Sequence, residues 1–247
     1  MSNIIEVSGV SKRFGGVIAN HEISLKVKKG AITGLIGPNG SGKTTLFNSV
    51  VGYHPIDAGS ITFEGSEISK LQVQDIARLG LLRTFQQTRI YGKMNCVQNM
   101  LISIPHRKAA FMDMFAPHSS ADNEKALSLL EFVGLYEKRN LLGGDLSFGQ
   151  QKLLEFAMAL MNDPSVLMLD EPTAGINPTL INGLIDRLKK ANEEFGITLF
   201  VIEHNMRVIM NMAEKVYCLA HGQLLASGTP DQIQNDQSVI DAYLGAH

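Results

Sequence analysis

The sequence has few cysteines and no long apolar run, and these absences exclude several classes of protein. Its two cysteines, Cys96 and Cys218, lie far apart and outside any CxxC motif. Neither a disulfide framework nor a zinc site is therefore expected, and a reducing cytoplasm fits best. No stretch approaches the roughly 18 consecutive apolar residues of a membrane-spanning helix, and Met1–Glu6 lacks the pattern of a signal peptide. If the protein acts at a membrane, we expect a partner to hold it there.

The chain also lacks an excess of charge of either sign. Its 247 residues include 22 Lys and Arg against 24 Asp and Glu, a net charge of -2, and 45% of the residues are hydrophobic. Such a balance provides no positive electrostatic potential to attract nucleic acid, so we expect no nucleic-acid partner. The length suits one large domain, or one domain with a substantial insertion.

Three short apolar runs predict buried strands of a parallel sheet. They are Ile32–Ile36, Val166–Leu169 and Thr198–Ile202, each rich in apolar residues and ended abruptly by polar residues or glycine. Helical patterns lie between them, over Lys43–Val51 and Gln150–Met161. This alternation of strand and helix predicts an α/β fold.

Two other regions differ from this alternation. Apolar and polar residues alternate over Ile4–Val10 and Ile61–Phe63, which predicts a small antiparallel sheet. From about residue 91 to 144 helical spacing takes over, and we interpret this region as a helical insertion into the α/β core. Its clearest helix is Asn123–Val133, and its apolar face is expected to consist of Ala126, Leu127, Leu130 and Val133. The composition of Pro105–Ser120 supports no assignment of secondary structure.

A glycine-rich segment follows the first predicted strand directly. Residues Gly37–Thr44 fit the pattern G-x-x-x-x-G-K-[ST]. Glycines let successive backbone N–H groups turn toward phosphate oxygens, and the following helix directs its positive end at the same anion. Lys43 is expected to reach the β- and γ-phosphates, and Thr44 to bind Mg²⁺. The predicted nucleotide site comprises Gly37, Pro38, Asn39, Gly40, Ser41, Gly42, Lys43, Thr44 and Thr45.

Two acids, Asp170 and Glu171, end the second predicted strand. Ligands of open α/β sheets bind at this end of the strands. Asp170 is expected to help hold Mg²⁺, and Glu171 to polarise the attacking water as a general base. An Asp-Glu pair before a proline is also a common way to end a strand, so the meaning of this pair depends on the glycine-rich segment. Together they indicate a P-loop ATPase or GTPase.

Residues Leu146–Gln150, which read Leu-Ser-Phe-Gly-Gln, resemble the signature of the ABC ATPase family. The family usually has Leu-Ser-Gly-Gly-Gln, so four of five positions match and Phe148 departs. Other segments along the chain, before and after this one, resemble family motifs and occur in the order usual for the family. They are Phe14 at the place of the aromatic against adenine, Gln86 of the Q-loop, Ala174–Asn177 of the D-loop and His204, the switch histidine.

The resemblance covers essentially the whole chain and implies a single ABC ATPase domain. Residues 1–90 and 145–247 would form a RecA-like P-loop core with an N-terminal antiparallel β subdomain, and residues 91–144 an inserted α-helical subdomain. The resemblance assigns catalysis to Glu171, His204 and Gln86, and it assigns Mg²⁺ to Thr44, Gln86 and Asp170. It also adds signature residues to the nucleotide site, namely Ser147, Phe148, Gly149 and Gln150.

A head-to-tail dimer is a further implication. The signature begins a predicted helix and is not expected to reach its own Gly37–Thr45 loop across the insertion, so it would contact the γ-phosphate held by a second ATPase subunit, identical or paralogous. ATP would close this dimer, and hydrolysis would reopen it. The other implied partners are transmembrane permease subunits and, indirectly, a substrate-binding protein. The expected location is the cytoplasmic face of the cell membrane.

Within the family, the chain is most similar to the ATPases of branched-chain amino-acid uptake. Its motifs Leu-Ser-Phe-Gly-Gln-Gln, Ala-Gly-Ile-Asn-Pro and Val-Ile-Glu-His-Asn-Met carry this likeness, together with Pro105–Ser120. ATPases for urea, amides or lipopolysaccharide remain alternatives. A soluble ABC ATPase of DNA repair or translation is disfavoured, because long coiled-coil heptads and a second cassette are both absent from the sequence. A third alternative, a P-loop protein that serves only as a nucleotide-dependent scaffold, would require that Glu171 or His204 has no catalytic role.

Overall fold

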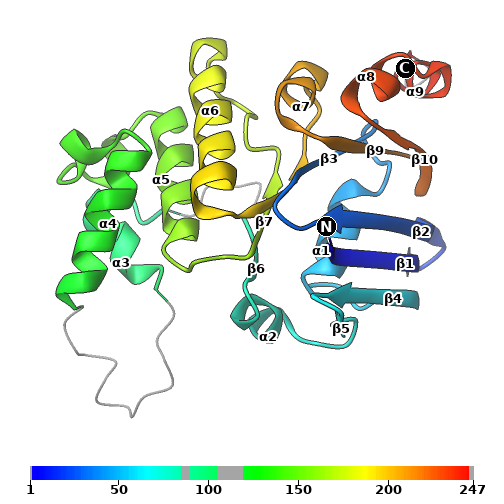
Figure 1. Cartoon of the computed structure of the whole chain (residues 1–247), viewed down its shortest axis with the longest axis horizontal. Coiled ribbons are helices and arrows are strands. Elements are labelled where there is room, and N and C mark those ends of the chain that lie inside the picture. The colour runs from blue at the N-terminus through cyan, green and yellow to red at the C-terminus, as the bar shows by residue number, and fades with distance from the viewer. Residues whose placement is uncertain (1, 85–89, 105–118, 245–247) are drawn as a thin grey trace. The chain divides into compact units, whose positions relative to one another are not determined.

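The computed structural model describes residues 2–84, 90–104 and 119–244, and their contacts divide the chain into two compact units. Unit 1 consists of Met1–Arg83, Ser165–Pro172 and Leu188–His247, and it carries both β-sheets (Figure 1). Unit 2 consists of Thr84–Pro164 and Thr173–Arg187 and is helical. The predicted insertion at 91–144 falls within unit 2, and its standing as a separate subdomain stays a prediction.

The larger sheet of unit 1 has six strands in the order β10-β9-β3-β8-β7-β6. Five of them are parallel, and only β10 runs antiparallel to its neighbour. Three central strands are buried along their whole length, which explains their continuous apolar sequence. The strand bounds are β3 (Ile32–Ile36), β6 (Leu81–Arg83), β7 (Val166–Asp170), β8 (Thr198–Ile202), β9 (Lys215–Ala220) and β10 (Gln223–Gly228).

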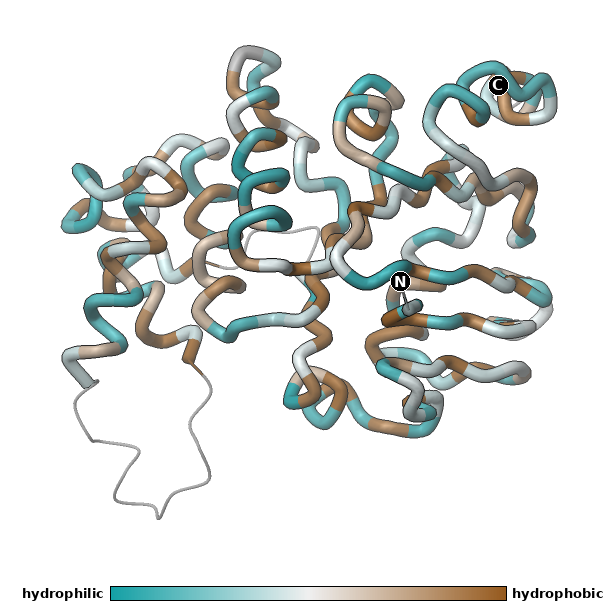
Figure 2. Tube along the Cα trace, in the orientation of Figure 1, coloured by the Kyte–Doolittle hydropathy of each residue, from teal (hydrophilic) through white to brown (hydrophobic). Residues whose placement is uncertain are grey.

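The smaller sheet confirms the predicted N-terminal antiparallel subdomain. Its order is β2-β1-β4-β5, with antiparallel pairing throughout. Hydrophobic and polar residues alternate along β1 and β2, because one face of the sheet meets the core and the other meets solvent (Figure 2). The strands are β1 (Asn3–Phe14), β2 (Val17–Lys28), β4 (Ala58–Phe63) and β5 (Ser66–Glu67).

Helix α1 (Lys43–Val50) packs into the core that the two sheets share. Its residues Leu46, Phe47 and Val50 are fully buried there beside strands of both sheets. The ring of Phe47 lies against that of Phe200 on β8, with centroids 4.7 Å apart. This packing holds the N-terminus of α1 beside the carboxyl end of β3. The remaining helices of unit 1 are α2 (Val73–Arg78), α7 (Met206–Met212), α8 (Pro230–Gln234) and α9 (Gln237–Leu244).

Unit 2 is built from α3 (Cys96–Ile102), α4 (Ser120–Phe132) and α5 (Phe148–Leu160), with two short 3-10 helices, η2 (Tyr136–Lys138) and η3 (Gly143–Asp145). Helix α6 (Pro178–Phe195) begins here and continues into unit 1 after Arg187. No helix among the described residues is long and apolar enough to cross a membrane.

The structure corrects the predicted apolar face of α4 in one position. Ala126, Leu130 and Val133 are fully buried, as expected, but Leu127 is only half-buried and Leu129 is buried in its place. The apolar stripe is therefore wider than a single row of positions, because α4 contacts both α3 and α5.

A buried ion pair joins the adjacent strands β6 and β7. Arg83, at the end of β6, donates from Nη2 to Oδ2 of Asp170, at the end of β7, over 2.5 Å. The side chains are 7% and 0% exposed. The other guanidinium nitrogen, Nη1, donates to Oδ1 of Asn48 on α1. Arg83 thus connects β6, β7 and α1, and it balances the charge of a carboxylate that has no exposed surface.

We expect Arg83→Met to lower the free energy of unfolding of the protein by roughly 3–5 kcal/mol, because it leaves the buried carboxylate of Asp170 without its cation. Urea denaturation followed by circular dichroism measures this change. Arg78→Met is the matched control, because Arg78 pairs with Asp75 where both side chains are more than half exposed. That control is expected to cost less than about 1 kcal/mol. Equal shifts in the two variants would contradict the role given to Arg83.

Candidate nucleotide site

The loop that follows β3 can be made only with glycine at two of its positions. Gly37 and Gly42 have φ angles of 147° and 98°, which L side chains rarely adopt. A Cβ on Gly37 would lie 2.1 Å from the carbonyl oxygen of Leu219 on β9, and one on Gly42 would lie 2.3 Å from that of Ala19 on β2. The loop is therefore threaded between the two sheets of unit 1 at places where no side chain fits.

Lys43 is buried, and its ammonium group points back into the loop. Nζ donates to the carbonyl oxygens of Gly37 and Pro38 over 2.8 and 2.9 Å, and to Oγ of Ser41 over 3.4 Å. Burial lowers the pKa of this ammonium, although the negative charges of Glu171 and Asp170 act in the opposite direction. A cation held by neutral oxygens in a desolvated place binds a phosphate anion strongly once one enters the loop.

The first turn of α1 completes the loop. Its N-cap is Gly42, and no side chain caps it, so the first backbone N–H groups of the helix have no side-chain acceptor. Thr44 is exposed and Thr45 half-buried at this turn. The hydroxyl of Thr44, predicted to bind Mg²⁺, is therefore accessible from outside the protein.

Asp170 has one carboxylate oxygen bound and one without a partner. Oδ2 accepts from Arg83, whereas Oδ1 is buried and has no hydrogen-bond partner among the described residues. A buried carboxylate oxygen of this kind suits a hard cation or its water shell. No cluster of three or more His, Cys, Asp or Glu side chains able to hold a metal occurs in the described ranges. Mg²⁺ nevertheless fits, because it is commonly bound by one or two carboxylates together with substrate phosphates.

Glu171 and His204 meet at the edge of the sheet. Glu171 has a positive φ of 50° and donates its backbone N–H to the carbonyl oxygen of Ile202 over 2.9 Å. Its Oε1 lies 2.5 Å from Nε2 of His204. The structure therefore brings together two of the three predicted catalytic side chains. The unusual φ separates the direction of Glu171 from that of Asp170, and strain of this kind is typical of functional sites.

Two predicted residues at the site have different outcomes. Phe14, expected against adenine, ends β1 with 45% of its surface exposed, and its ring contacts that of His54 edge-on with centroids 5.1 Å apart. It is therefore an accessible aromatic platform rather than a core residue. Gln86, expected to ligate Mg²⁺ and to sense the membrane partner, lies outside the described residues.

In unit 2 the signature residues form the start of α5. Ser147 is the N-cap, and its Oγ accepts from the backbone N–H of Gln150 while Oε1 of Gln150 accepts from the N–H of Ser147. This capping box explains why α5 begins at Phe148 rather than at the predicted Gln150. Ser147 and Phe148 are exposed, but Gly149 is buried. A Cβ on Gly149 would lie 3.1 Å from Leu180, so this glycine serves close packing.

The sequence did not reveal three residues that support the predicted site. Arg83 donates both to Asp170 and to Oδ1 of Asn48, and the hydroxyl of Tyr243 accepts a hydrogen bond from the backbone N–H of Gly37 over 2.9 Å. For Arg83 the sequence contains one signal, a cationic residue directly after two apolar residues at the end of a short strand. Tyr243 left none, because 206 residues separate it from Gly37.

Known proteins similar to this chain are ABC transporter components. Residues 20–174 match the family model described as ABC transporter, and residues 223–247 match one described as branched-chain amino acid ATP-binding cassette transporter. The chain is 39% identical to the high-affinity branched-chain amino acid transport ATP-binding protein BraF of Pseudomonas aeruginosa, over 98% of each chain. It is 36% identical to the corresponding LivG protein of Escherichia coli, also over 98% of each.

Solved structures give the same result. A nucleotide-free ATP-binding cassette from an ABC transporter matches with a TM-score of 0.88 and 31% identity, over 98% of this chain and 99% of the other. The ADP conformation of an ATP-binding cassette of an ABC transporter matches with a TM-score of 0.90 and 32% identity, over 99% and 100%. The RecA-like fold with its antiparallel sheet is thereby confirmed. The chain belongs to the ABC transporter family, as one of its ATP-binding, ATP-hydrolysing subunits.

Proposed function

We propose that this ATPase binds MgATP at Gly37–Thr45, closes a head-to-tail dimer with a second ATPase subunit, and drives import of branched-chain amino acids through a membrane permease. The observation that supports the site best is the contact between Glu171 and His204, 2.5 Å apart at the ends of β7 and β8. The charges of Glu171 and Asp170 also act on the Lys43 ammonium in the loop after β3, the neighbour of β8.

In this proposal Glu171 is the general base. Its carboxylate accepts the proton of the attacking water, and His204 orients the carboxylate through their contact and reaches the γ-phosphate. Lys43 leaves the loop carbonyls for the β- and γ-phosphates and offsets their charge. Thr44, Gln86 and Asp170 would hold Mg²⁺, which supplies charge neutralisation at the phosphates when bound. Phe14 offers its exposed ring to the adenine.

The dimer is supported by the way the signature is built. Ser147 and Phe148 are both exposed, so they can meet a second subunit. The side chain of Gln150 is committed to the capping box and orients Ser147 rather than reaching outward. Ser147 would contact the γ-phosphate held by the second subunit, where the N-terminus of α5 favours an anion. One helix end would then serve nucleotide binding and dimerisation together.

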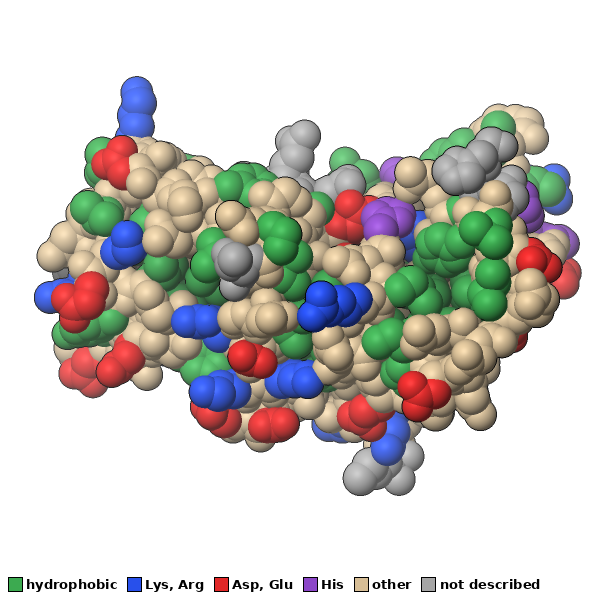
Figure 3. All heavy atoms as spheres, turned by 90° about the horizontal axis from the view of Figure 1, so that it is seen from above, with side chains coloured by type: hydrophobic (Ala, Val, Ile, Leu, Met, Phe, Trp, Pro, Cys, Tyr) green, Lys and Arg blue, Asp and Glu red, His purple; other side chains and the backbone are tan. Residues whose placement is uncertain are grey.

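The cargo and the membrane partners are inferred from the relatives. Proteins 36–39% identical over nearly their full length are named as branched-chain amino acid transport ATP-binding proteins. The match at 223–247 is to a model described by the same cargo. Acidic and basic side chains are interspersed on the face drawn in Figure 3. We place the chain at the cytoplasmic face of the membrane, bound to permease subunits that receive cargo from a substrate-binding protein.

We expect Glu171→Gln to reduce ATP hydrolysis by roughly 10²- to 10⁴-fold, because glutamine keeps the size of glutamate but cannot accept the proton of the water. The loop, Asp170 and Ser147 are unchanged, so MgATP should still bind and should hold the dimer closed. A phosphate-release assay measures the rate, and size-exclusion chromatography measures the dimer with MgATP and with MgADP. Glu64→Gln, at an exposed ion pair with Lys29, is the control. Hydrolysis at the native rate would place the base elsewhere.

We expect Lys43→Ala and Ser147→Arg each to abolish hydrolysis, but a mixture of the two to recover it. In a head-to-tail dimer, one composite site carries both lesions and the other carries neither. With equal amounts of each chain, half of the dimers are mixed, so roughly a quarter of the native rate should return. A mixture that stays inactive although mixed dimers form would show that the signature serves its own loop.

Lys43→Ala alone should weaken nucleotide affinity by about 2–5 kcal/mol.

A transport assay tests the cargo. We expect the complex purified from native membranes through a tag on this chain to contain permease subunits. Reconstituted in vesicles that contain ATP, with its binding protein outside, the complex should accumulate labelled leucine or valine. The same complex carrying Glu171→Gln is the control and should accumulate neither. Uptake of urea or an amide in place of leucine would contradict this cargo but leave the ATPase assignment intact.

A further inference from the structure

The C-terminal helix α9 is connected to the nucleotide loop by a hydrogen bond. The backbone N–H of Gly37 donates to the hydroxyl oxygen of Tyr243 over 2.9 Å. Gly37 is buried and follows Ile36, the last residue of β3 that pairs with β9. Its N–H therefore lies at the end of the sheet ladder, where a buried donor needs a partner. The hydroxyl of Tyr243 supplies that partner from near the end of the described chain.

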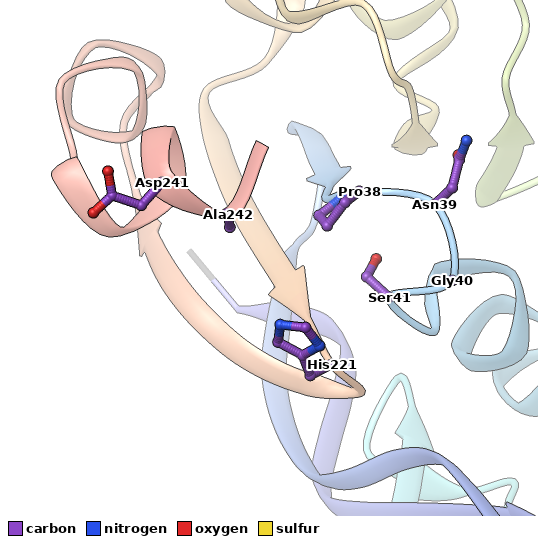
Figure 4. A pocket seen from close by; sticks show the side chains of 7 residues that line it. All are labelled: Pro38, Asn39, Gly40, Ser41, His221, Asp241 and Ala242. Carbon is purple, nitrogen blue, oxygen red and sulfur yellow. The ribbon is translucent and has the colours of Figure 1, made fainter. Parts of the chain in front are cut away.

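Open space lies beside this hydrogen bond, between α9 and the loop. A pocket of about 310 Å³ lies there, lined by Pro38, Asn39, Gly40, Ser41, His221, Asp241 and Ala242. Figure 4 shows α9 on one side of this pocket and the loop on the other, with His221 at the turn between β9 and β10. Because the pocket separates α9 from residues 38–41, tight packing does not hold the outer side of the loop against α9. The hydroxyl of Tyr243 does so at Gly37.

Gly37 is held at both of its polar groups. Its N–H is bound by Tyr243, and its carbonyl oxygen accepts from Nζ of Lys43 over 2.8 Å. The position of Gly37 therefore also sets the position of the lysine that is assigned to the phosphates. A shift of this residue toward β9 is opposed, because a Cβ built on it would already lie 2.1 Å from the carbonyl oxygen of Leu219. The hydroxyl of Tyr243 opposes a shift toward solvent.

Two groups near Gly37, the hydroxyl of Tyr243 and the thiol of Cys218, are neutral at physiological pH. Burial raises the pKa of Tyr243 to about 12 and that of Cys218, the β9 partner of Ile36, to about 11. A neutral hydroxyl can hold the N–H without forming an ion pair with Lys43. An acidic side chain at the same place would attract the ammonium and would repel the phosphates. Tyrosine therefore holds the loop in place without competing with phosphate for the positive charge of Lys43.

We propose that Tyr243 is a positioning residue for nucleotide binding, which fixes Gly37 and so keeps the loop ready for phosphate. The proposal rests on the assignment of Gly37–Thr45 as the ATP site. Loss of the hydroxyl leaves a buried N–H without a partner, so the loop samples other arrangements and must be ordered again when nucleotide binds. Tyr243 acts through Gly37 and contacts no reacting atom.

The test compares Tyr243→Phe with Tyr217→Phe in the full chain. The hydroxyl of Tyr217 also bonds to backbone, to the N–H and carbonyl of Lys26 on β2, so both variants lose a tyrosine hydroxyl that is bonded to backbone in unit 1. We expect Tyr243→Phe to weaken MgADP affinity roughly 3- to 10-fold in a fluorescence titration, the equivalent of one hydrogen bond. Tyr217→Phe should leave affinity within roughly twofold of native. Thermal unfolding of both variants measures the general loss of stability.

Hydrogen exchange of the Gly37 amide provides a readout that a merely structural role would not move. In protein labelled with ¹⁵N-glycine, this amide should exchange at least tenfold faster in Tyr243→Phe than in native protein or Tyr217→Phe, a loss of protection on the scale of one hydrogen bond. Unchanged affinity, or weaker affinity with unchanged exchange of Gly37, overturns the proposal. Lys43→Ala distinguishes failure of the ATP-site assignment from failure of the role given to Tyr243. If Lys43→Ala loses MgADP binding but Tyr243→Phe binds like native protein, the ATP site stands and the positioning role of Tyr243 is rejected.

Discussion

The proposed nucleotide site depends on one steric constraint, the close approach of the loop after β3 to the backbone of β9, where no side chain fits. Gly37 lies so close to the carbonyl of Leu219 that any Cβ would overlap it. This close approach turns the chain sharply after the last buried residue of β3, and the loop carbonyls then face the ammonium of Lys43. The core supports the turn, because Phe47 anchors α1 against Phe200 on β8. Loop, lysine and helix thus form one rigid arrangement.

The two acids at the carboxyl end of β7 show how adjacent residues come to lie in different environments. Asp170 is fully buried and bound by Arg83, so its charge is balanced within the protein, and its Oδ1 has no hydrogen-bond partner among the described residues. Glu171 turns away through a positive φ and meets His204. A continuous strand would have pointed Glu171 to the opposite face of the sheet.

Much of the fold could be predicted because its signals are local. The bounds of β3 and β8 agree with the predicted strands, since strands buried on both faces are continuous apolar runs bounded by polar residues. The helix bounds were less certain, because α5 begins with a capping box that involves two residues before its periodic pattern is visible. Leu129 was missed on α4 for a related reason. A single row of positions cannot show that a helix packs against two neighbours.

The site could be predicted only as far as its motifs are contiguous. Gly37–Thr44 follow β3 directly, Asp170 ends β7 and Glu171 follows it, and His204 follows β8 after one residue, so strand order alone gathers them at the carboxyl ends of the strands. Arg83 and Tyr243 reach the same place by tertiary contacts that no spacing encodes. Both hold a residue of a recognisable motif in place. In the proposed site, the motif would supply the groups that meet nucleotide, and residues remote in sequence would hold those groups in position.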